Sequence, residues 1–207
     1  MKQEESRPRR LSRAEAKRRT RELLLESAAH TFARRGFAGA SVEEIAELAG
    51  FSVGALYSNF ASKQQLFVEL MSDRASTRIA QALEIVEHRH ETDPLAAAGQ
   101  MMAEAADQDQ DFALLQAEFW LYAVRHPEAL EAIWDRMNAP RETLRALIDA
   151  AMRRRGVAPG VPVESVTTLV LALFQGLAQQ RRLDPERVPP ELFGNALRWL
   201  FTGLQQR

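Results

Sequence analysis

The sequence predicts an all-α protein of about nine helices. Apolar residues recur with the 3.6-residue period of amphipathic helices along most of the chain, and the alternation typical of strands is never sustained. The chain has 207 residues, of which 46% are hydrophobic and 27% charged, so it can bury a sizeable core. It contains no cysteine, which excludes disulfides, thiolate metal sites and thiol nucleophiles.

Capping and breaking residues predict where these helices begin and end. The expected helices cover residues 14–35, 42–49, 53–60, 62–86, a segment from 94, then 111–124, 127–155, 163–182 and the segment after 190. Gly36, Gly50 and Gly156 are expected to end three of them. Ser41 is expected to form a capping box with Glu44 at the start of the second.

Positive charge is concentrated at the N-terminus. Residues 1–21 contain nine Lys or Arg against three Glu, a net charge of +6, although the whole chain carries −1. The remaining residues therefore carry −7. This asymmetry predicts a surface near the N-terminus that faces a polyanion. The alternative is a solvated basic tail that contacts nothing.

No targeting or membrane segment is predicted. The charged residues 1–10 lead into no apolar h-region, and no later stretch approaches the roughly 18 uninterrupted apolar residues of a membrane span. We therefore expect a cytoplasmic protein that does not contact a membrane.

A tight helical corner is predicted within residues 42–60, which read VEEIAELAGFSVGALYSNF. The small Ala46 allows two helices to cross closely, and Gly50 permits the positive φ of an abrupt turn. Ile45, Leu56 and Phe60 are expected to bury the inner side of the corner.

The outer side of residues 53–60 carries no long charged side chain. It is left with small, polar and aromatic residues: Val53, Gly54, Tyr57, Ser58 and Asn59. A hairpin with only a structural role normally exposes Glu and Lys there. Small groups instead let a helix approach base edges in a major groove, where methyl groups meet thymine methyls and hydroxyls bond phosphates or bases. The pattern therefore favours double-stranded DNA as the partner.

Residues 20–71, and above all the run SVEEIAELAGFSVGALYSNFASKQQLF, strongly resemble the N-terminal domain of the TetR family of bacterial transcriptional regulators. The C-terminal run LALFQGLAQQRRLDPERVPPELFGNALRWL is similar to the dimerisation helices of one branch of the family, whereas residues 72–161 match nothing specific. The resemblance implies a three-helix helix-turn-helix DNA-binding domain followed by a helical dimerisation and ligand-binding domain. On this division residues 1–13 are a basic extension, 14–62 the DNA-binding domain and 63–207 the remainder.

The same resemblance implies a DNA-binding transcriptional regulator. Repression, relieved by a small-molecule effector, is the commoner habit of the family, although activation and a regulator that senses nothing stay open. Phosphate contacts are implied for Ser41, Ser52, Tyr57 and Lys63. Base contacts are implied for Val53, Gly54 and Ser58. Val53 and Asn59 stand where relatives often carry other residues, so the operator sequence stays open.

Four arginines of the N-terminal extension are candidates for a minor-groove arm, because arginine is drawn to its negative potential. They are Arg7, Arg9, Arg10 and Arg13, of which Arg10 and Arg13 lie nearest the first helix. The alternative is an extension that does not touch DNA.

A homodimer on a pseudo-palindromic operator is expected, because one helix-turn-helix buries too little surface for tight specific binding. The eighth and ninth helices are the candidates for a four-helix bundle across the twofold axis. Their apolar stripes contain Val166, Leu169, Val170, Leu173, Leu177, Leu197, Leu200, Phe201 and Leu204. The alternative is that these stripes pack within one subunit.

Aromatic and methionine side chains of the middle helices are the candidates for an effector pocket. They are Met101, Met102, Phe112, Phe119, Trp120, Tyr122 and Trp134, with Phe174 from the eighth helix. They suggest a moderately apolar effector, although aromatic residues at helical spacing more often belong to a core.

No enzymatic or metal site is expected, and no cofactor. His88 and His90 are two residues apart, which points them away from each other on a helix, and with Glu91 they favour a solvated helix end. His126 has no nucleophile beside it. The chain contains no glycine-rich phosphate loop, HExxH or GxSxG pattern.

Overall fold

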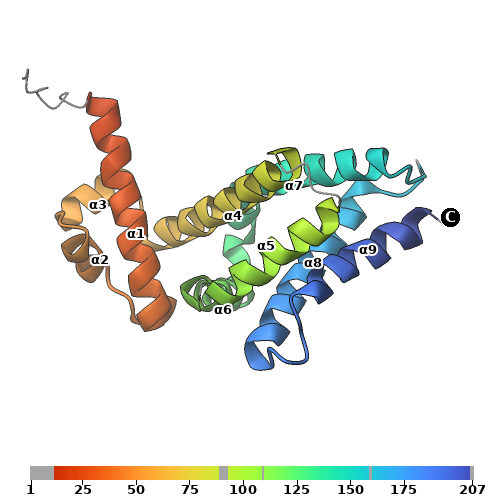
Figure 1. Ribbon diagram of the computed structural model, residues 1–207. Helices are drawn as coiled ribbons and strands as arrows, with labels where there is room; N and C mark the ends of the chain where they lie inside the picture. The colour runs from red at the N-terminus through yellow and green to blue at the C-terminus, as the bar shows by residue number, and fades with distance from the viewer. Residues whose placement is uncertain (1–11, 89–92, 109, 159, 206–207) are drawn as a thin grey trace, which may run out of the picture. The chain divides into compact units, whose positions relative to one another are not determined.

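The computed structural model describes residues 12–88, 93–108, 110–158 and 160–205 (Figure 1). In these ranges it has nine α-helices, one short 3-10 turn and no strand, which confirms the all-α prediction. The chain forms two compact units, Met1–Phe67 and Val68–Arg207, which we call the head and the body. Their boundary falls inside α4 (Lys63–His88), after its first turn.

The head is built from α1 (Arg13–Gly39), α2 (Val42–Leu48), α3 (Val53–Asn59) and the first turn of α4. Gly36 interrupts the helical path of α1 with a φ of 69°, and a further turn runs on to Gly39. Gly50, with a φ of 77°, makes the corner between α2 and α3. Both glycines were expected at these breaks.

Side chains satisfy the free amides at the start of α1 and α2. A complete capping box, which the sequence analysis missed, begins α1: Ser12 Oγ accepts the Glu15 amide at 3.2 Å, and Glu15 Oε2 accepts the Ser12 amide at 2.7 Å. The capping box predicted at Ser41 is only half formed. Ser41 Oγ accepts the Glu44 amide at 3.0 Å, but the Glu44 carboxylate lies 3.5 Å from Arg35 Nε instead.

The core of the head is aromatic and aliphatic. Ile45, Leu56 and Phe60 are fully buried, as the corner predicts. The rings of Phe32 and Phe67 meet edge to face, with centroids 4.9 Å apart. This packing fixes α1 against the start of α4, because edge-to-face ring pairs add to the gain from burial.

The body contains the rest of α4 and five further helices. They are α5 (Pro94–Gln108), α6 (Gln110–Arg125), α7 (Leu130–Arg154), α8 (Val163–Leu183) and α9 (Glu191–Gln205). The predicted helix from Pro127 is instead a 3-10 turn, Pro127–Ala129, followed by α7. Gly156 ends α7 with a φ of 68°, as expected.

The closest helix crossing of the body lies between α5 and α9, which run side by side in Figure 1. A Cβ atom placed on Gly99 would stand 2.2 Å from the Gly194 amide nitrogen. The two backbones therefore touch, and only glycine fits there. Two apolar clusters flank this crossing: one joins α5, α7, α8 and α9, and the other joins α5, α8, Val188 and Phe193.

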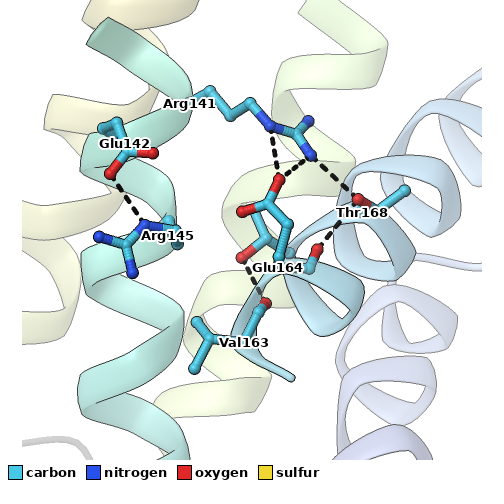
Figure 2. Close-up of polar contacts among 7 residues, drawn as sticks. Arg141, Glu142, Arg145, Val163, Glu164 and Thr168 are labelled. Carbon is cyan, nitrogen blue, oxygen red and sulfur yellow. Dashed lines mark hydrogen bonds and ion pairs between the residues drawn. The ribbon is translucent and has the colours of Figure 1, made fainter. Parts of the chain in front are cut away.

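Ion pairs connect neighbouring helices of the body. Arg181 of α8 is almost fully buried and holds Asp107 of α5 through two bonds of 2.6 and 2.7 Å, which lower the pKa of the Asp107 carboxyl. Figure 2 shows Arg141 of α7 reaching α8. Its Nε donates to Glu164 Oε1 at 2.9 Å, and its Nη2 donates to Thr168 Oγ1 at 3.1 Å.

Among the described residues, no helix is both long and apolar enough to cross a membrane.

Candidate nucleic-acid interface

The outer surface of α3 has no charged side chain, as predicted. Gly54 and Ser58 are exposed, Tyr57 is 49% exposed and Val53 is half-buried. A Cβ on Gly54 would meet only Ser52 Oγ, at 3.8 Å. Packing within the head therefore does not require a glycine at this position. The lack of a side chain leaves a surface that another molecule can approach closely.

Two exposed serines lie at the starts of α2 and α3. Ser41 Oγ and Ser52 Oγ accept the amides of Glu44 and Ala55 at 3.0 and 3.2 Å. A hydroxyl has one donor and two acceptor positions. Each serine can therefore cap its helix and still donate its O–H to a phosphate, so capping and the predicted contact are compatible.

Two residues at the end of α3 turn toward their own helix. Ser58 Oγ and Asn59 Nδ2 both donate to the Ala55 carbonyl at 2.8 Å, and Asn59 is half-buried. Asn59 is therefore less open than predicted, and its part in DNA binding stays a prediction. The reason is that a side-chain amide near a helix end finds a backbone carbonyl one turn earlier.

Arg21 of α1 holds the C-terminal end of α3, a role that the sequence analysis missed. Its Nη1 donates to the Asn59 carbonyl at 2.7 Å, and its guanidinium lies 4.2 Å from the centroid of the Phe60 ring. A cation at a helix C-terminus also interacts favourably with the helix dipole. Only the tertiary fold brings these residues together, because they are 38 positions apart.

Lys63 is directed into the head rather than outward. Its Nζ donates to the carbonyls of Phe37 and Ala40 at 2.8 and 2.9 Å and lies 4.7 Å from the centroid of the Phe37 ring. Partial burial lowers the pKa of this ammonium group. Because the group has three N–H donors, one remains for the phosphate contact that the family resemblance implies.

The two arginines nearest α1 differ from the expected arm. Arg10 lies outside the described residues, as do Arg7 and Arg9. Arg13 is the first residue of α1 and is exposed, so it belongs to a helix rather than to an extension. The capping box at Ser12 explains this boundary.

The predicted dimer residues divide into two groups. Val166, Val170, Leu197 and Phe201 are buried in the core of the subunit itself, packed with residues of α5 and α7. For these four, the prediction of an interface is wrong and the alternative of packing within one subunit holds. Leu169 is 48% exposed, and Leu173, Leu177, Leu200 and Leu204 are half-buried. Trp199, which the sequence analysis did not name, is 65% exposed.

The predicted pocket residues do not form one group. Met102 and Phe174 pack against the cluster around Phe193. Phe112 is buried beneath the Arg78 guanidinium, which lies 4.0 Å from its ring centroid.

Tyr122 is buried and lies against the His126 ring; its pKa is raised by burial and then by the Glu128 charge. Met101 and Phe119 are half-buried. Trp120 and Trp134 are 65% and 60% exposed, so their predicted place in an interior pocket needs correction. Their helices turn these rings to the outside of the subunit.

The residues considered for a metal site lie outside the described side chains. This holds for the side chain of His88 and for His90 and Glu91. Among the described residues, no group of three or more His, Asp or Glu is arranged to hold a metal ion.

The head and most of the body match known protein families. Residues 24–70 match the model described as bacterial regulatory proteins, tetR family, and residues 91–200 match the model described as BetI-type transcriptional repressor, C-terminal. The fold and the helix-turn-helix define a DNA-binding transcriptional regulator. The chain belongs to the TetR family, in which ligand-responsive repression is typical.

Individual relatives agree with this assignment. The transcriptional repressor NicS of Pseudomonas putida is 31% identical over 146 residues, which cover 68% of this chain and 61% of NicS. The regulator TtgR of Pseudomonas putida is 27% identical over 197 residues, which cover 89% of this chain and 90% of TtgR.

A putative transcriptional regulator from Pseudomonas aeruginosa PAO1 has a similar structure, with a TM-score of 0.74, 24% identity and coverage of 95% of this chain and 93% of that one. GusR of Salmonella enterica has a similar structure, with a TM-score of 0.70 and 23% identity. The match covers 91% of this chain and 96% of the GusR chain.

Proposed function

We propose that this chain is a homodimeric repressor that holds a pseudo-palindromic operator through α3 and releases it when a small, moderately apolar molecule binds the body. The observation that carries the DNA-binding part is the surface of α3, which is exposed and uncharged beside a basic α1. A helix reads base edges only where it approaches them closely, and flanking cations neutralise phosphates.

Within this surface each residue has a distinct part. Val53 and Gly54 face the bases, with the Val53 methyls suited to thymine methyls. The hydroxyls of Ser41, Ser52 and Tyr57 donate to phosphates, and they position the helix without reading sequence.

The dimer uses the exposed parts of α8 and α9. Leu169, Leu183 and Trp199 are the large apolar side chains exposed on the described parts of these two helices, and a partner subunit would cover them. Gly176 and Gly203 are exposed on the same two helices, and a Cβ on either would meet nothing within 4 Å in the subunit. A neighbouring backbone can therefore approach there, as a helix bundle between two subunits requires.

The effector site is proposed among the half-buried apolar side chains of the middle helices, with Met101 and Phe119 as its candidates. Their chemistry supports an apolar ligand, because neither offers a charge.

Selection of bound sequences from a random DNA pool tests the function. The purified full-length chain should enrich one sequence with twofold symmetry, and addition of an effector should release that DNA. The variant Tyr57→Phe keeps the ring and loses the hydroxyl, so it should bind the selected operator about 1 kcal/mol more weakly with an unchanged base preference. Failure to enrich any sequence, with or without small molecules, would contradict the proposal.

A further inference from the structure

The first two turns of α1, residues 13–19, are helical although almost all of their side chains are exposed. The first buried residue of α1 is Leu24, and Arg13–Leu23 are all exposed or half-buried. Burial therefore does not explain why this segment is a helix. The capping box at Ser12 begins it, and the hydrogen bonds from Ser12 lower the pKa of Glu15. The residues that follow are mostly good helix formers.

Two of its cations have no partner in the described part of the chain. Arg18 and Arg19 lie 3.7 and 3.6 Å from the Glu22 carboxylate. Arg13 and Lys17 are exposed, and neither makes an ion pair with any described residue. Residues four apart share a helix face. Arg13, Lys17 and Arg21 therefore form one row of cations along α1, which we call the stripe.

Arg21 fixes where this stripe lies within the head. It bonds the Asn59 carbonyl, which is the end of α3. A helix rises 1.5 Å per residue, so Lys17 lies about 6 Å and Arg13 about 12 Å beyond that contact. Figure 1 shows this part of α1 continuing past α3.

We propose that Arg13 and Lys17 form a second phosphate-binding surface, which contacts the DNA backbone that flanks the bases read by α3. The proposal rests on the proposed function, because it extends the same interface. On each strand, one phosphate occurs for every 3.4 Å of the duplex axis. Lys17 and Arg13 are about 6 Å apart along the helix, so each can meet a different phosphate beyond the end of α3.

The arrangement favours DNA over an acidic protein as the occupant. The stripe meets α3 at its C-terminal end, where Arg21 bonds the Asn59 carbonyl, and a rigid row of cations spaced by single helix turns suits a regular row of phosphates.

Salt dependence of affinity tests the proposal. The full-length chain and the variant Arg13→Gln, Lys17→Gln are titrated with the selected operator between 50 and 200 mM salt. Each phosphate contact contributes about 0.9 to the slope of log K against log salt, so loss of four contacts in a dimer should lower the slope by about 3.6. Glutamine is a good helix former, and circular dichroism should show unchanged helicity.

A matched control separates contact from net charge. The variant Arg19→Gln, Arg34→Gln removes the same charge from the same helix at exposed positions off the stripe, and its slope should fall by less than about 0.9. An operator shortened by four base pairs at each end should reduce the slope of the wild-type chain to that of the Arg13, Lys17 variant.

The inference is overturned if the Arg13, Lys17 variant keeps the wild-type slope, or if both double variants lower it equally. Either result, obtained with a wild-type chain that still selects its operator, leaves the proposed function intact. A wild-type chain that selects no sequence contradicts the proposed function itself.

Discussion

The head and the body hold their helices together by different contacts. In the head, cations from one helix donate to the carbonyls that end another: Arg21 bonds the last residue of α3, and Lys63 bonds two carbonyls at the end of α1. Arginine–acid pairs join helices in both units, as Arg35 does with Glu44 in the head and Arg181 with Asp107 in the body. The body also brings two backbones into contact, at Gly99 and Gly194.

The difference follows from helix length. α2 and α3 have seven residues each, which is too short for a stable helix in isolation. Their free carbonyls and amides are a large share of their backbone, so caps and cations decide their stability. The helices of the body are longer and bury apolar stripes, and their side-chain pairs and glycines decide which helices are neighbours.

The largest effect is expected at the α5–α9 crossing. Gly99→Ala would place a methyl group 2.2 Å from the Gly194 amide nitrogen, where only backbone can move. Overpacking of this kind should lower the free energy of unfolding of the body by about 3 kcal/mol. Denaturant titration of the full chain, at one fixed protein concentration, measures this change in the free energy of unfolding.

The control is the same substitution in the head. Gly39→Ala meets only Arg35 Cβ, at 3.7 Å, and should change stability by no more than about 0.5 kcal/mol. If both variants are equally stable, the backbones of α5 and α9 do not touch as described.

A smaller effect is expected at the outer surface of α8 and α9. Trp199→Ala should weaken dimerisation by about 2 kcal/mol, or about 30-fold, because buried tryptophans carry much of the energy of an interface. Sedimentation equilibrium without DNA measures the dissociation constant. Trp134→Ala is the matched control, because Trp134 is 60% exposed in the subunit and Trp199 is 65% exposed. Equal dissociation constants for the two variants would exclude Trp199 from the interface.

The smallest effect is expected at Lys63. Lys63→Met keeps most of the side-chain length and removes two bonds to carbonyls, so the head should lose about 1 kcal/mol of stability in the absence of DNA. Lys17→Met, at an exposed position, should lose almost none. A Lys63 variant as stable as wild type would leave phosphate binding as its only role.

Much of the head could be predicted because its signals are local. Gly50 and the alternation of small and apolar residues around it predict the corner and its buried side, and Ile45, Leu56 and Phe60 are indeed fully buried. The uncharged surface of α3 could be predicted for the same reason. Asn59 could not, because a single hydrogen bond to the Ala55 carbonyl turned its side chain away.

The body was less predictable because its apolar stripes have several possible partners. The periodicity of α8 and α9 shows that Val166, Leu169, Val170 and Leu197 are apolar helix positions, but it does not say whether a subunit or its partner covers them. The structure buries three of these four within the subunit and leaves Leu169 exposed. The exposed Trp120 and Trp134 show the same ambiguity among aromatic residues.

By itself, the sequence determined the helical class of this protein, the helix ends at its glycines and serines, and the corner that presents α3. These depend on residues within a few positions of one another, so local backbone preferences and hydrophobic period specify them. Only the tertiary structure decided that Arg21 holds the end of α3, that Gly99 meets Gly194 and which apolar positions stay exposed. Each of these joins residues far apart in the chain, and such pairings are set by how whole helices pack.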